Sequence, residues 1–140
     1  AVHKWGTEGT GDGQFDMPNG VAVAPDGSVY VADTFNNRIQ KFTSSGVFVS
    51  KWGTEGTGDG QFNRPIGIAV ASDGSVYVAD SQNDRIQKFT PQGVFVSKWG
   101  TQGTGEGEFS HPNDVAVASD GSIYVTDYWN NRIQKFSTVQ

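Results

Sequence analysis

The sequence predicts an all-β fold, a β-propeller with three four-stranded blades per chain, and three observations support this class. The 140-residue chain repeats itself every 47 residues. Each repeat holds four short segments rich in β-branched and aromatic residues, and no segment has the apolar period of an amphipathic helix. Four antiparallel strands in a repeat of 40 to 50 residues are typical of a propeller blade. A β-sandwich with chance internal similarity is the less favoured alternative.

The repeat is marked by a Lys-Trp-Gly-Thr motif that begins at Lys4, Lys51 and Lys98. When the three copies are aligned, 25 of 43 columns are identical in all of them, and the first two copies differ at only 10 of 47 positions. Copies this similar favour recent duplication or deliberate engineering of the chain. We therefore expect three nearly equivalent blades.

The strands of the first copy are expected at about residues 20–25, 28–33, 38–43 and 47–52, from the propeller axis outward. An Asp26-Gly27 turn joins the first two of them. The predicted units are an outer latch strand at 1–6 and blades at 15–53, 62–100 and 109–140. Residues 1–6 align with a fourth strand, whereas the third blade lacks an outer strand of its own.

Three blades are too few for a ring, because propellers have four to eight of them. The two end blades would leave apolar faces and a strand edge uncovered, and such surfaces recruit another chain. We expect a homodimer with two-fold symmetry and six blades, in which residues 1–6 of one copy pair with residues 132–137 of the other. A nine-bladed trimer with the same strand exchange is the less favoured assembly.

Composition excludes several functions. The chain has no cysteine, so disulfides, cysteine-ligated zinc and thiol nucleophiles are ruled out. Its net charge of -5, with Lys and Arg spread along the repeat, argues against nucleic acid as a partner. No apolar run approaches the roughly 20 residues that span a membrane, so no membrane partner is expected.

Three segments of each copy resemble the NHL repeat. In the first copy they read Pro18 to Val23, Asp26 to Asp33 and Asn36 to Phe42, and the glycine-rich segment from Trp5 to Phe15 is similar as well. The Asn-His-Leu triplet that names the family is replaced here, for example by Asn36-Asn37-Arg38. The resemblance implies a six-bladed propeller, the form that most NHL domains have. It also implies a protein- or RNA-binding platform, an extracellular sensor domain or, in a minority, a metal-assisted lyase or lactone hydrolase.

The Asp, Asn and Arg that recur in every copy, such as Asp33, Asn36 and Arg38, are interpreted as structural, because active sites are rarely threefold. Recognition is expected where the copies differ, in the loops on one face around the channel mouth. The predicted binding residues are Met17, Asn19, Phe35, Arg64, Gln82, His111, Asp114, Tyr128 and Trp129. Tyr128 and Trp129 are the preferred candidates, and drift at exposed positions is the competing explanation.

These observations predict a non-catalytic, self-assembling β-propeller scaffold that needs no cofactor. No catalytic residue and no metal ligand is assigned. One alternative is an NHL module that binds an unidentified protein or small molecule through the variable loops. A second alternative, a metal-dependent lyase or hydrolase, would have to use His111 and Asp114 from both copies, which would lie on opposite sides of the ring.

Overall fold

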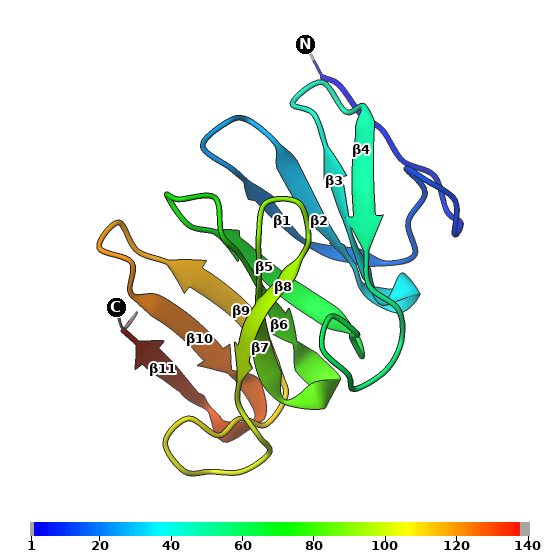
Figure 1. The fold of residues 1–140 in the computed structure, drawn as a ribbon. Coiled ribbons are helices and arrows are strands. Elements are labelled where there is room, and N and C mark those ends of the chain that lie inside the picture. The colour runs from blue at the N-terminus through cyan, green and yellow to red at the C-terminus, as the bar shows by residue number, and fades with distance from the viewer. Residues whose placement is uncertain (1, 138–140) are drawn as a thin grey trace.

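The computed structural model describes residues 2–137, which form three antiparallel sheets placed side by side in an arc (Figure 1). Blade 1 contains β1 (Pro18–Val23), β2 (Val29–Asp33), β3 (Arg38–Phe42) and β4 (Phe48–Trp52). Blade 2 contains β5 (Pro65–Val70), β6 (Val76–Asp80), β7 (Arg85–Phe89) and β8 (Phe95–Trp99). Blade 3 contains β9 (Pro112–Val117), β10 (Ile123–Asp127) and β11 (Arg132–Phe136). The all-β class and the repeated blade are confirmed.

The innermost strand begins and ends two residues earlier than predicted. β1 ends at Val23 because Ala24 already belongs to the hairpin turn, where its carbonyl accepts the Gly27 N–H at 2.9 Å. Asp26 Oδ1 accepts the Ser28 N–H at 2.9 Å and closes the turn, and Gly27 has a φ of +91°, which glycine adopts without strain.

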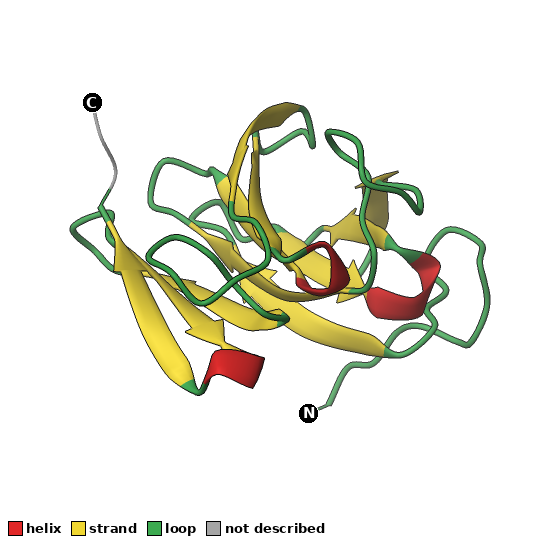
Figure 2. Cartoon of the chain, turned by 90° about the horizontal axis from the view of Figure 1, so that it is seen from below, coloured by secondary structure: helices red, strands yellow, loops and turns green. Residues whose placement is uncertain are grey.

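A single turn of 3₁₀ helix follows the second strand of each blade (Figure 2). These turns are η1 (Thr34–Asn36), η2 (Ser81–Asn83) and η3 (Tyr128–Asn130). Each ends in a left-handed residue, with φ between 53° and 55°, at Asn37, Asp84 and Asn131. Asn and Asp tolerate this conformation better than most residues, which explains why only these two types occupy the position. Among the described residues there is no helix long and apolar enough to cross a membrane.

The hydrophobic core lies between blades. We call the side of a blade that packs on the next blade its leading face, and the opposite side its trailing face. At the first junction, the leading-face residues Tyr30, Ala32 and Ile39 of blade 1 are buried with Phe62 and Ile68 of blade 2. The second junction repeats this arrangement with the equivalent residues of blades 2 and 3. Each blade thus depends on its neighbours to bury its apolar surface.

The two outermost faces of the arc are uncovered. On the trailing face of blade 1, Val21 is 66 % exposed, whereas its counterpart Ile68 is 5 % exposed. On the leading face of blade 3, Ile133 is 63 % exposed, whereas Ile86 is fully buried. The described part of the chain therefore presents two unfilled halves of a blade junction.

Residues 2–6 belong to no strand among the described residues, and Ala1 of the predicted latch lies outside them. The segment nevertheless packs on blade 1, where the Trp5 ring lies 5.7 Å from that of Phe42. Trp52 takes the equivalent position on Phe89 at 5.4 Å. Trp5 thus lies where the outer strand of a preceding blade would place it.

Candidate functional site: the loop face of the arc

The loops that vary between copies meet on one side of the arc, which we call the loop face. It consists of the residues before each innermost strand together with η1, η2 and η3. Backbone bonds join the two loops of each blade: the N–H groups of Phe35, Gln82 and Trp129 donate to the carbonyls of Asp16, Asn63 and Ser110 at 3.0–3.1 Å. The two variable loops of each blade therefore lie side by side.

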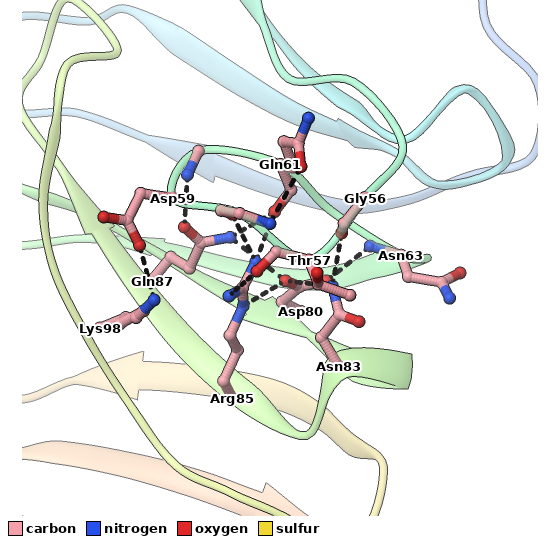
Figure 3. Close-up of polar contacts among 12 residues, drawn as sticks. Gly56, Thr57, Asp59, Gln61, Asn63, Asp80, Asn83, Arg85, Gln87 and Lys98 are labelled. Carbon is pink, nitrogen blue, oxygen red and sulfur yellow. Dashed lines mark hydrogen bonds and ion pairs between the residues drawn. The ribbon is translucent and has the colours of Figure 1, made fainter.

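A buried polar network anchors this side of each blade, and Figure 3 shows it for blade 2. In blade 2, Asp80 Oδ2 accepts from Arg85 Nε at 2.7 Å and from Asn83 Nδ2 at 3.0 Å. The remaining Arg85 nitrogens donate to the carbonyls of Thr57, Gly58 and Gln61 at 2.8–2.9 Å. The three bonds from Arg85 to these carbonyls fix the loop backbone to β7, and Asp80 holds the Arg85 side chain in place, so the network acts structurally. The same bonds recur in blades 1 and 3.

The equivalent carboxylates of blades 2 and 3 differ in their pKa. Burial raises the pKa of Asp80 in spite of its hydrogen bonds with Asn63, Asn83 and Arg85. Burial also acts to raise the pKa of Asp127, but there the hydrogen bonds outweigh it and the pKa is lowered. The difference follows from the uncovered leading face of blade 3, which leaves its network closer to water.

Arg64 and Phe35 form a contact between blades on the loop face. The Arg64 guanidinium lies 4.2 Å from the centroid of the Phe35 ring, a cation–π distance. The Arg64 N–H donates to Asn37 Oδ1 at 2.8 Å, which ties the loop of blade 2 to η1 of blade 1. The guanidinium therefore has a defined position on the surface.

His111 and Trp129 form a second pair within blade 3. Their rings are stacked at 3.8 Å with an interplanar angle of 18°. The His111 N–H donates to Asp84 Oδ1 at 2.8 Å, and its Nδ1 is buried without a hydrogen-bond partner among the described residues. Trp129 remains 62 % exposed and Tyr128 60 % exposed, so blade 3 presents an aromatic surface to solvent.

The other predicted residues do not join these pairs. Met17 is 63 % exposed, and Asn19 Nδ2 donates to Thr34 Oγ1 at 3.0 Å within blade 1. Gln82 lies exposed in η2, and Asp114 lies exposed on β9, where its Oδ1 accepts the Val115 N–H at 2.9 Å. The structure thus distributes the nine candidates over three blades instead of gathering them in one pocket.

Sequence reasoning missed the residues that link the blades. Asn37 and Asp84 accept backbone N–H groups of the following blade, and Thr34 Oγ1 donates to the Pro65 carbonyl at 2.7 Å. The one sequence signal for these links was that the residue at the end of each 3₁₀ turn is always Asn or Asp. Among residues 2–137 there is no group of three or more His, Asp or Glu side chains that could hold a metal ion. That the chain is not an enzyme stays a prediction.

The fold and the loop face define an arc of β-propeller blades. The NHL repeat model matches residues 15–42, 62–89 and 109–136, which together make up more than half of the chain. The chain belongs to the NHL repeat family, and the resemblance of its motifs is thereby confirmed.

Several relatives match over single stretches of the chain. Protein lin-41 of Caenorhabditis elegans is 45 % identical over 49 residues, which cover 35 % of this chain and 4 % of that protein. The B-box type zinc finger protein ncl-1 of the same organism is 51 % identical over 45 residues, 32 % of this chain and 5 % of that protein. The E3 ubiquitin-protein ligase TRIM71 of Rattus norvegicus is 48 % identical over 47 residues, 34 % of this chain and 6 % of that protein. The chain thus spans only a small part of these relatives.

Solved structures share the fold. A catalytically inactive virginiamycin B lyase from Staphylococcus aureus with quinupristin superposes with a TM-score of 0.62 at 17 % identity, covering 94 % of this chain and 43 % of that chain. A luciferin-regenerating enzyme gives a TM-score of 0.62 at 19 % identity, covering 84 % of this chain and 39 % of that chain. At these identities the likeness shows the fold alone.

Proposed function

We propose that two copies of the chain close a six-bladed ring by exchanging their N-terminal segments, and that the ring is a non-catalytic scaffold. The observation that carries the proposal is the position of Trp5. It packs on Phe42 as Trp52 packs on Phe89 and as Trp99 packs on Phe136. Trp52 and Trp99 each end the outer strand of the preceding blade, so residues 2–6 are held where blade 3 of a second copy would need its outer strand.

The uncovered faces support the same assembly. The leading face of blade 3 retains Tyr124 and Ile133, the counterparts of residues that fill both junctions within the chain. On the trailing face of blade 1, a hollow lined by Trp5, Phe15 and Val21 among others has no blade in front of it. In their apolar parts one open face is therefore complementary to the other, and joining two copies at both ends covers the apolar parts of all four faces. The near-identical blades fit a chain made by duplicating one unit.

The in-chain pairing gives the register of the exchange. Lys41 of β3 lies opposite Ser50 of β4. Their counterparts are Lys135 on β11 of one copy and His3 of the other. A strand added in this register forms hydrogen bonds with the backbone groups at the free edge of β11, and it completes the third blade with four strands.

Cysteine cross-linking tests this pairing without background, because the chain has no cysteine of its own. A His3→Cys, Lys135→Cys variant should form a covalent dimer on oxidation, seen by non-reducing electrophoresis. The matched control is Lys41→Cys, Ser50→Cys, whose cross-link lies within one chain and should keep the monomer mass. Cross-linking of the test variant only within single chains, or not at all while the control closes, would contradict the exchange. A covalent trimer would point to nine blades.

A second candidate function is recognition of a protein or small molecule on the loop face. It is supported by the exposed Trp129 ring, which is held in place by stacking on His111. Exposed aromatic side chains of fixed position are frequent anchors in binding surfaces. Peptides selected against the immobilised chain should lose binding in Trp129→Ala and keep it in Val94→Ala, an exposed position outside the loop face. Equal binding to both variants would place recognition elsewhere.

A further inference from the structure

The two junctions within the chain depend on small side chains at one corner of the leading face, next to the loop face. Their burial shows how tightly the following blade approaches: Ala32 and Ala79 are fully buried, and Thr34 and Ser81 are 2 % exposed. The three positions are Gly20, Ala32 and Thr34 in blade 1 and Gly67, Ala79 and Ser81 in blade 2.

The glycine position has no room for a side chain. A Cβ on Gly67 would lie 2.5 Å from the Asn113 carbonyl oxygen on the innermost strand of the next blade. A Cβ on Gly20 would meet the Ile66 carbonyl oxygen in the same way. Both neighbours are backbone atoms, which cannot give way as the end of a side chain could, so this approach of the blades requires glycine.

Blade 3 departs from this pattern at all three positions. It carries Asp114 for glycine, Thr126 for alanine and Tyr128 for the small hydroxyl residue. The first two form one cluster, because the Asp114 N–H donates to Thr126 Oγ1 at 2.8 Å. Away from this corner the leading face keeps the repeat residues, including Tyr124 and Ile133.

We propose that Asp114, Thr126 and Tyr128 form a wedge that holds the seam between two copies apart at its loop-face corner. The inference rests on the proposed ring, and it makes the two seams different from the four junctions within chains. Contact at the seam is then confined to the apolar part of the face and to the exchanged outer strand. The two seams are therefore the weaker, polar-lined joints of the ring.

The wedge also removes a specific hydrogen bond. Within the chain, the Arg64 N–H donates to Asn37 Oδ1 and the His111 N–H donates to Asp84 Oδ1, both at 2.8 Å. Each bond joins a blade to the preceding one. At the seam, the equivalent donor and acceptor are the Met17 N–H of one copy and Asn131 Oδ1 of the other. Met17 already has the required left-handed conformation, with a φ of 54°. A wedged seam keeps these two groups apart, so the Met17 amide stays open to water in the dimer.

Restoring the repeat residues tests the wedge. In Asp114→Gly, Thr126→Ala, Tyr128→Ser we expect the dimer dissociation constant, measured by sedimentation velocity over a dilution series, to fall about tenfold or more. Hydrogen exchange at Met17 should slow at the same time. The matched control transfers the wedge to blade 2 as Gly67→Asp, Ala79→Thr, Ser81→Tyr, which should lower the urea midpoint of unfolding by separating blades 2 and 3.

The outcomes separate the wedge from the ring. If the unaltered chain dimerises and the restored variant binds no more tightly, the wedge is wrong and the ring stands. If neither protein dimerises at any concentration, the ring itself is wrong. If only the restored variant dimerises, the wedge is established as the feature that opposes closure. The single variant Asp114→Gly provides the same readout if the triple variant fails to fold.

Discussion

Arg85 Nε donates to Asp80 Oδ2 at 2.7 Å, and this ion pair recurs in every blade with a change of surroundings at the end of the arc. In blade 2 the Arg85 side chain is 8 % exposed, whereas its counterpart Arg132 in blade 3 is 31 % exposed. The bonds themselves keep the same geometry, at 2.7–2.8 Å in all three blades. The difference in exposure therefore measures how much of this side chain a following blade covers.

The buried pair should dominate the stability of its blade. Asp80→Ala leaves the Arg85 guanidinium buried without its counter-charge, and we expect a loss of about 3–5 kcal/mol in the free energy of unfolding. The control is Asp59→Ala, which breaks the exposed ion pair with Lys98 and should cost about 0–1 kcal/mol. Urea unfolding followed by tryptophan fluorescence checks both. Equal losses in the two variants would show that burial of the pair is unimportant.

The close approach of the innermost strands should be intolerant of a methyl group. Gly67→Ala places a Cβ against the Asn113 carbonyl, and we expect a loss of about 1–3 kcal/mol in the free energy of unfolding. Gly58→Ala is the comparison, because its Cβ would meet the Gln61 side chain, which can move. Thermal unfolding distinguishes the two, and a Gly67→Ala chain as stable as the unaltered one would mean that the blades lie further apart.

The carboxylates of the hairpin turns should make the stability of the fold decrease at low pH. The Ser75 N–H, as the main cause, holds the pKa of Asp73 below its ordinary value, and the equivalent turns lower the pKa of Asp26 and Asp120. Because the folded chain keeps these groups ionised to lower pH than the unfolded chain does, their stabilisation is present above pH 3.8 and is lost as the pH falls through the lowered values.

Asp73→Asn keeps an acceptor oxygen in the turn but cannot ionise. We therefore expect the urea midpoint of this variant to fall less steeply between about pH 5 and pH 2 than that of the unaltered chain. Glu55→Gln serves as the control, because the Glu55 side chain is exposed and has no hydrogen bond among the described residues. If the urea midpoint of Asp73→Asn falls with pH as steeply as that of the unaltered chain, other carboxylates cause the loss of stability in acid.

The strands and the repeat were predictable because alternating apolar residues and Asp-Gly turns act locally. β1 was predicted to end two residues too late because Ala24 and Pro25 continue the apolar run. They belong to the turn, as the hydrogen bond from the Gly27 N–H to the Ala24 carbonyl shows. The hydrogen bonds that join one blade to the next could not be predicted. Asn37 contacts Arg64 27 residues later, and that contact depends on the angle between two sheets.

For the loop face, sequence comparison of the copies identified the variable positions but not their partners. Phe35, Gln82 and Trp129 are equivalent positions of the repeat. The structure pairs Phe35 with Arg64 of the next blade, but it pairs Trp129 with His111 of the same blade. Equivalent positions thus make different contacts because the side chain that meets them differs in reach and shape.

The most direct test of ring closure is the mass of the intact 140-residue chain in solution, measured by light scattering after size exclusion. Closure by two copies predicts a particle of twice the chain mass of 15.0 kDa, which dissociates only on dilution. A stable particle of 15.0 kDa at every concentration would contradict it, because both apolar end faces would then remain in water.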